Sequence, residues 1–296
     1  MSINYHFVDQ AFKLLFQNKE MIQSLLRDIV KEPWVRVIDI NSLNPENVEF
    51  TSIEKPGLST DLLLRFSTKY SSDLYIYLHM EFQTTPEKMG CRILEYLSRI
   101  YRRQEQAGGA LSPVVPIVIY SSKRKWRENT EFIQKFTHVP QAMDKYLPNF
   151  RYFLVDIHSF HEKELRNLKT AVSEFMLLEK TDFKNRKKAI SRIIRILDEI
   201  KSNNPSIFSL LKSYILGLLE KKSIIEREAV TEFLYDQEDK GMLIESLNEL
   251  MEEERKKGKL EAAKRMLEKK YPVQDISEIT GLSIEEIENL QNDSSQ

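Results

Sequence analysis

Two neighbouring segments with strand-like alternation constrain the fold of this chain most. The first runs from Asp61 to Phe66 and the second from Asp73 to Gln83, with a polar turn between them. Successive side chains of a strand point to opposite faces, so the second segment has one apolar face and one polar face. The apolar face carries Leu74, Ile76, Leu78, Met80 and Phe82, and the polar face carries Tyr75, Tyr77, His79, Glu81 and Gln83. This pattern predicts an antiparallel β-hairpin.

The segments around this hairpin predict a mixed α/β fold. Apolar residues recur at helical spacing in residues 7–30 and 88–106. Further strands are expected at residues 35–40, 48–53, 114–120 and 152–157. Beyond residue 165 the spacing is helical only, so an α/β core with a helical C-terminal extension is expected. Its helical segments are expected near residues 165–180, 184–201, 206–220 and 225–235.

Composition excludes several classes of protein. The chain has 44 Lys and Arg against 45 Asp and Glu, a net charge of −1, so a basic coat like that of a histone is excluded. The single cysteine, Cys91, excludes an internal disulfide and a cysteine-based metal cage, and is expected to be a small buried residue. There is no Walker A or dinucleotide-binding motif. With neither a signal peptide nor a long apolar run, a cytoplasmic location is expected.

The hairpin also places polar residues where they could do chemistry. If its turn centres on Ser71, Asp61 lies opposite Glu81, and a shift of two residues still leaves the pair diagonal on one face. Gln83 shares that face, with His79 and Arg65 flanking the group. Two close carboxylates repel unless a cation lies between them or one is protonated, and Mg²⁺ binds such oxygens. The alternative is an ordinary solvated sheet face.

At these residues the chain resembles a known superfamily. The spacing Asp61-x19-Glu81-x-Gln83 is similar to the signature of the PD-(D/E)XK nucleases, whose restriction-endonuclease-like core has the order αβββαβ. More narrowly, the chain resembles the Rpn, or YhgA-like, family of recombination-promoting nucleases and putative transposases. The segments that carry this resemblance are residues 8–20, 60–66, 77–86, 92–103 and 113–126, and the tail ITGLSIEEIENL.

The resemblance implies a role for each matching residue. Asp61 and Glu81 would bind Mg²⁺ or Mn²⁺, and Asp9 would bind the metal through water. Gln83, which stands where the superfamily has lysine, would orient the attacking water and contact a phosphate oxygen. Lys13, one helical turn after Asp9, would supply the missing positive charge. For Asp9 and Lys13 a surface ion pair is an equally good interpretation.

The function implied is that of a Mg²⁺-dependent endonuclease that cleaves double-stranded DNA in recombination or transposition. The alternative is a catalytically inactive nuclease fold that binds DNA or protein. Basic residues near the expected cleft are candidates for DNA backbone contacts, although solvated surface is the usual role of any single one. These candidates are Lys123, Arg124, Lys125, Arg127, Arg99 and Arg102.

Three regions are expected along the chain. Residues 1–175 would form the nuclease-like domain, 176–238 a helical extension packed on it, and 239–296 a charged helical tail. The tail ends in a helix-turn-helix-like piece in which Ser283 and Glu286 form a capping box and Gly281 lies at the turn. Its last helix is acidic, which argues against reading DNA and favours a small module for packing or for self-association. A homo-oligomer through the C-terminal helices is therefore one candidate assembly.

Overall fold

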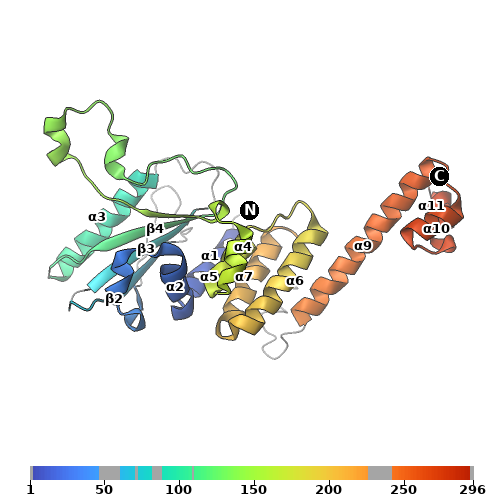
Figure 1. The fold of residues 1–296 in the computed structure, drawn as a ribbon, viewed down its shortest axis with the longest axis horizontal. Helices are drawn as coiled ribbons and strands as arrows, with labels where there is room; N and C mark the ends of the chain where they lie inside the picture. The colour runs from blue at the N-terminus through green and yellow to red at the C-terminus, as the bar shows by residue number, and fades with distance from the viewer. Residues whose placement is uncertain are drawn as a thin grey trace. The chain divides into compact units, whose positions relative to one another are not determined.

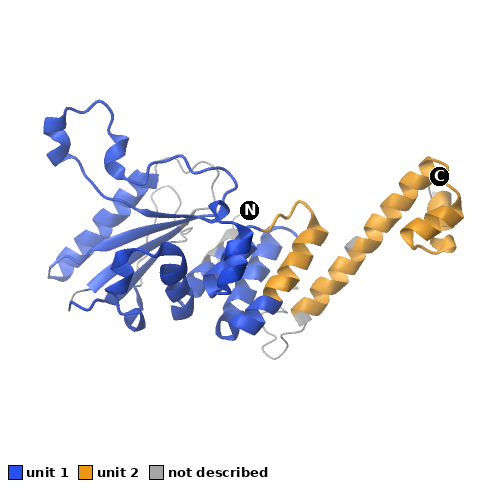
Figure 2. Cartoon of the chain, in the orientation of Figure 1, with its two compact units in different colours: residues 1–180, 198–230 blue, residues 181–197, 231–296 orange. Residues whose placement is uncertain are grey.

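The computed structural model describes residues 3–46, 61–70, 73–81, 89–108, 110–225 and 242–293. The chain divides into two compact units, coloured separately in Figure 2. Unit 1 comprises residues 1–180 and 198–230, and unit 2 comprises residues 181–197 and 231–296. The division into three regions expected from the sequence stays a prediction. Within the described ranges, no helix combines the length and apolar composition needed to cross a membrane.

Unit 1 is built on a five-stranded mixed sheet with the strand order β1-β2-β3-β4-β5 (Figure 1). The strands are β1 (Asn44–Glu46), β2 (Leu62–Ser67), β3 (Asp73–Glu81), β4 (Val114–Tyr120) and β5 (Phe153–Asp156). The first three strands pair antiparallel, whereas β4 is parallel to β3 and β5 is parallel to β4. The helix α3 (Met89–Ala107) connects β3 to β4. The mixed α/β fold and the predicted αβββαβ order are therefore confirmed.

Helices cover both faces of this sheet. Side chains of α3 pack with Leu63, Tyr77, Val118 and Tyr120 in one apolar cluster on one face. The other helices of unit 1 are α1 (Ile3–Gln17), α2 (Lys19–Ser24), α4 (Glu162–Leu168), α5 (Ala171–Glu179) and α7 (Phe208–Lys221). Among them, α1 contacts β2 and packs along α7. Aromatic contacts join Phe12 and Phe16 of α1 to Phe175 of α5, and Phe175 to Tyr214 of α7.

The hairpin register is shifted by two residues from the expected one. Leu62 pairs with Leu78 and Ser67 with Asp73, so the turn centres on Tyr70 rather than Ser71. The position opposite Asp61 is consequently that of His79, and Asp61 and Glu81 are diagonal. On its other side, the chain after β2 is bonded to an earlier segment: Asp39 N–H donates to the carbonyl of Ser67, and Lys69 N–H donates to that of Val37.

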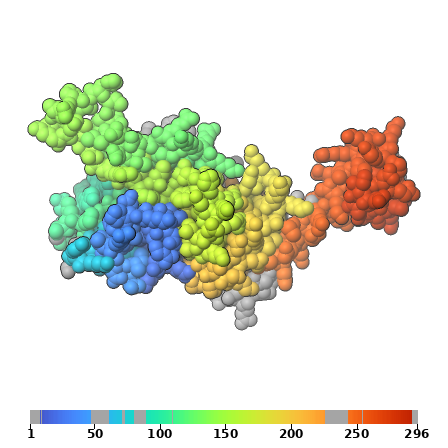
Figure 3. Space-filling model, viewed as in Figure 1, coloured from blue at the N-terminus to red at the C-terminus, as the bar shows by residue number. Residues whose placement is uncertain are grey.

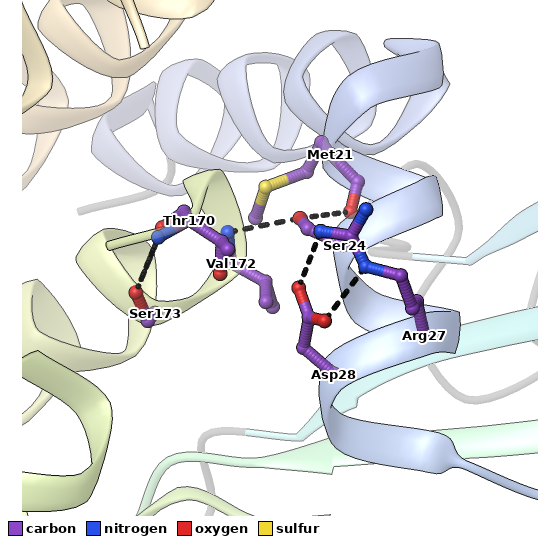
Figure 4. Close-up of polar contacts among 7 residues, drawn as sticks. All are labelled: Met21, Ser24, Arg27, Asp28, Thr170, Val172 and Ser173. Atoms are coloured by element: carbon purple, nitrogen blue, oxygen red, sulfur yellow. Dashed lines mark hydrogen bonds and ion pairs between the residues drawn. The ribbon is translucent and has the colours of Figure 1, made fainter. Parts of the chain in front are cut away.

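The N-terminal segment is not one continuous helix. Asn18 interrupts it, because its side chain accepts hydrogen bonds from the backbone N–H of Glu20 and Met21 and so begins a new helix, α2. A π-helical turn, η1 (Leu25–Val30), then follows α2. Figure 4 shows the polar contacts that hold α2 and η1 in place. Ser24 accepts from the backbone N–H of Val172 at 3.1 Å, which ties the end of α2 to the start of α5.

The expected strand at 35–40 is wrong. Pro33 begins a 3-10 helix, η2 (Pro33–Arg36), because its fixed φ suits a first helical turn. A second 3-10 helix, η3 (Ile40–Ser42), follows, and Ile38 makes an isolated bridge to Thr68. The expected strand at 48–53 and the expected helix at 225–235 lie outside the described residues, except for Ile225. The two strands expected at 114–120 and 152–157 are confirmed as β4 and β5.

The later helices follow the predicted spacing closely. The segments expected at 184–201 and 206–220 are α6 (Arg186–Asn203) and, after the 3-10 turn η7 (Pro205–Ile207), α7. The C-terminal helices of unit 2 are α9 (Met242–Glu268), α10 (Val273–Thr280) and α11 (Ile284–Asp293). They enclose a small apolar core of Ala263, Ile276, Leu282 and Ile287.

The predicted helix-turn-helix end is confirmed. Gly281 has a φ of +67°, the left-handed conformation that ends α10. Ser283 accepts from the backbone N–H of Glu286, whose carboxylate accepts from the backbone N–H of Ser283. The capping box expected before the last helix is therefore present. Self-association through these helices stays a prediction.

Candidate active site

Asp61 is a buried carboxylate at the start of β2. Its residue is 4% exposed. The Tyr77 hydroxyl donates to Asp61 Oδ1 at 2.7 Å, and His79 Nδ1 lies 2.5 Å from the same oxygen. Both partners come from β3, directly across the hairpin, and both are buried. This carboxylate is therefore held in one orientation by two groups that the alternation of β3 places on one face.

Helix α3 adds a second layer to this group. Burial alone would lower the pKa of Arg92. The charge of Asp61, together with other contacts, outweighs burial and raises that pKa. Burial first, and then Asp61, raise the pKa of Tyr96 to about 12. Burial and the charge of Asp61 also raise the pKa of Tyr77 well above its usual range. These neighbours thus keep their protons at neutral pH and surround Asp61 with hydrogen-bond donors and one cation.

Two expectations about the surroundings of Asp61 need correction. Arg65 does not join the group, because it lies toward the other end of β2, where it pairs with Glu46 at 3.3 Å. Arg92 supplies the nearby guanidinium instead. Cys91 is exposed on α3 rather than buried, because it lies on the side of the helix opposite to the buried residues, which include Met89 and Ile93. The i, i+4 spacing of Arg92 and Tyr96 places both on one face of the helix, but it does not show which strands that face covers.

The group lies at the edge of the sheet where three parallel strands end. Glu81, Tyr120 and Asp156 are the last residues of β3, β4 and β5, and they pair in one row. Because β2 runs antiparallel, its first residues lie at this same edge, beside Asp61. In α/β sheets, ligands bind outside the carboxyl ends of the strands. This edge is therefore the candidate active site.

The predicted metal ligands are described to different extents. The backbone of Glu81 is described at the end of β3, but the side chains of Asp9 and Glu81 and all of Gln83 lie outside the described part. Lys13 is half-buried on α1. Among the side chains that the structure describes, no three His, Cys, Asp or Glu residues gather as a metal site. The shared cation of Asp61 and Glu81 stays a prediction.

A basic loop directly follows β4 at this edge. Its four cationic residues are exposed: Lys123, Arg124, Lys125 and Arg127. Between them, Trp126 is buried, with its ring centroid 4.9 Å from that of Tyr120 and 6.1 Å from that of Tyr152. The tryptophan anchors the loop, so the charged side chains around it point outward from a fixed backbone. Of the two arginines predicted on α3, Arg99 pairs with Glu95 and Arg102 is exposed.

Two consecutive residues at the end of α5 fix the loops that leave β4 and β5. Glu179 accepts hydrogen bonds from the Ser121 and Tyr214 hydroxyls, and the Tyr214 bond is 2.7 Å long. Lys180 Nζ donates to the backbone carbonyls of Ile157, His158 and Phe160. No sequence pattern predicted a role for either residue, because these contacts join segments far apart in the chain.

Glu179 makes the stability of the protein depend on pH. Burial raises its pKa, against the opposing effect of the two hydroxyl contacts. A carboxyl group whose pKa is higher in the folded state loses stabilising free energy as pH rises through that folded-state pKa. We expect Glu179→Gln to melt at a higher temperature than the parent at neutral pH, with a difference that shrinks on acidification. Thermal melts from neutral to acidic pH would check this expectation, with a substitution of the exposed Glu105, Glu105→Gln, as the control. A difference that widens as pH falls would contradict the assignment.

A family model described as "Putative transposase, YhgA-like" matches residues 6–207. The chain belongs to this family. The YhgA-like range contains Asp61, the hairpin, α3 and the basic loop, and it ends before α9, so the candidate site lies wholly within it. No curated protein and no solved structure matches the chain.

Proposed function

We propose that this YhgA-like protein is a metal-dependent endonuclease that hydrolyses phosphodiester bonds of double-stranded DNA during transposition or recombination. The observation that carries the proposal is the buried, oriented carboxylate of Asp61 at the carboxyl edge of the sheet. The family description, which names transposases, supports a reaction on DNA. The exposed basic loop at the same edge supports binding of the DNA backbone.

The chemistry of Asp61 fits a hard divalent cation. The Tyr77 hydroxyl donates to one oxygen of this carboxylate, and His79 Nδ1 lies within hydrogen-bond distance of the same oxygen. Mg²⁺ typically takes one or two protein carboxylates and completes its shell with water and phosphate oxygens. We propose Asp61 and Glu81 as direct ligands of Mg²⁺ or Mn²⁺, and Asp9 as a ligand through water.

The remaining residues have roles that follow from their side chains. Bound metal would polarise the scissile phosphate and lower the pKa of a water molecule. The amide of Gln83 can orient that water and donate to a phosphate oxygen, but it cannot take a proton near neutral pH. Lys13 would add positive charge near the phosphate. Tyr77 and His79 would keep the Asp61 carboxylate in position.

A second function is favoured by the same contacts. A carboxylate that already lies within hydrogen-bond distance of Tyr77 and His79 could be purely structural, in a nuclease fold that binds DNA or protein without cleaving. The two candidates differ in metal dependence. Supercoiled plasmid should be nicked or linearised with Mg²⁺ and remain intact with EDTA, and calorimetry should show Mg²⁺ binding to the protein alone. Plasmid binding without cleavage and without Mg²⁺ binding would favour the inactive fold.

A further inference from the structure

The connection between β4 and β5 is much longer than the joining of two neighbouring parallel strands requires. Residues 121–152 contain only two short 3-10 helices, η4 (Phe132–Lys135) and η5 (Gln141–Tyr146). Figures 1 and 3 show the middle of this segment, in green, standing out from the rest of unit 1. Loops of this length in a compact domain are uncommon and usually functional.

The outer part of this connection exposes large apolar side chains. Tyr146 is 69% exposed, Met143 45% and Phe136 38%. A single exposed apolar residue needs no explanation, but three within one short segment indicate a contact surface. We name residues 136–146 the tip.

The connection that carries the tip is basic. Residues 121–151 contain seven Lys and Arg against three Asp and Glu; four of these cations are those of the basic loop, and the tip itself has Lys145 and Asp144. Lys145 Nζ lies 5.0 Å from the centroid of the Tyr146 ring, so a cation accompanies the most exposed aromatic residue of the tip. An aromatic ring can stack on the flat base of a nucleotide, and basic side chains beside the ring can contact its phosphate. An apolar protein partner would not need this excess of positive charge.

The parts of the connection on either side of the tip, residues 121–135 and 147–152, form its stem. The stem is fixed beside the candidate site. The carboxylate of Glu128 accepts from the first two backbone N–H groups of α3, those of Met89 and Gly90, each at 3.0 Å. Lys135 forms an ion pair with Glu128. The rings of Phe132 and Phe150 stack with centroids 4.8 Å apart, which closes the stem. The tip is thus carried on a stem anchored at the start of the helix that leads away from β3.

From these observations we infer that the tip stacks on unpaired bases of DNA, next to the phosphates held by the basic loop. The inference rests on the proposed function and specifies its substrate class as DNA with a single-stranded or unstacked segment adjoining duplex. Duplex DNA buries its base faces, so an exposed tyrosine gains stacking contact only where bases are unpaired.

The test compares two DNAs by fluorescence anisotropy: a blunt duplex, and the same duplex with a single-stranded tail. Tyr146→Ala should weaken binding of the tailed DNA by about tenfold, and leave binding of the blunt duplex nearly unchanged. Tyr146→Trp, which keeps a ring, should retain tail binding. Tyr70→Ala is the matched control, because Tyr70 is 77% exposed on the hairpin turn of the same unit.

The outcomes separate this inference from the proposed function. A parent protein that binds neither DNA would overturn both. A parent that binds both DNAs, with Tyr146→Ala equal to it on the tailed DNA, would overturn the inference alone and leave the tip as a protein-binding surface. Quenching of 2-aminopurine placed in the tail, present with the parent and lost with Tyr146→Ala, would support base stacking directly.

Discussion

Asp61→Asn should lower the rate of DNA cleavage by about 10³-fold or more. The substitution keeps the shape of the side chain but removes the negative charge that would bind the metal. A bound metal ion contributes several kcal/mol of transition-state stabilisation, and each 1.4 kcal/mol corresponds to about tenfold in rate. Single-turnover cleavage of plasmid under saturating Mg²⁺, together with calorimetric Mg²⁺ binding, would measure the loss.

The same variant tests whether Asp61 has only a structural role. Tyr77 and His79 would lose a charged acceptor in a buried site, so we expect a loss of about 1–3 kcal/mol in the free energy of unfolding. If the substitution only relieved repulsion between carboxylates, stability would be unchanged or raised. The buried contacts of Asp61 with Tyr77 and His79 argue against that outcome. Asp73→Asn, at the other end of the same hairpin, is the matched control. Parental cleavage by Asp61→Asn would refute the metal assignment.

Neutralising the basic loop should weaken DNA binding by about 10²-fold or more at low salt. The variant replaces Lys123, Arg124, Lys125 and Arg127 by alanine and retains Trp126, so the buried anchor of the loop stays in place. Each phosphate contact that is lost should also reduce the slope of log affinity against log salt by about 0.9. Anisotropy titrations over a series of salt concentrations would give both quantities.

The control for this variant must carry the same change in net charge. The control variant replaces four exposed lysines elsewhere in the chain: Lys19, Lys69, Lys163 and Lys201. Their replacement by alanine should change affinity and salt slope much less, because they are dispersed over several elements. An equal loss with both variants would mean that DNA responds to overall charge rather than to the loop.

Local patterns predicted four of the five strands of the sheet, β2 to β5, but missed β1. The strict alternation of residues 73–83 and the apolar run of residues 114–120 identified β3 and β4, because each strand must bury its apolar face. Where backbone chemistry outweighed periodicity, the prediction failed. The apolar spacing of residues 7–30 continues across Asn18, yet the side chain of Asn18 caps a new helix. At residues 35–40, Pro33 favours a 3-10 turn over the expected strand.

The candidate site was only partly predictable for a different reason. Asp61 and its face of the hairpin follow from spacing along one segment, and the two-residue shift of register leaves that face unchanged. Arg92, Glu179 and Lys180 join the site region through contacts between distant segments, which no local pattern contains. The same limit explains why Arg65 was expected beside Asp61, although its partner is Glu46 of β1.

The carboxylate of Glu128 has a consequence for how this protein can recognise phosphate. Amides at the start of a helix often hold phosphate directly, with fixed geometry. Here the first two amides of α3 are already bonded to Glu128, which also places a negative charge in front of them. Under the proposed function, a DNA strand approaching this end of α3 would therefore be held by long lysine and arginine side chains. Such contacts adapt to bent, nicked or irregular backbones and discriminate little between base sequences.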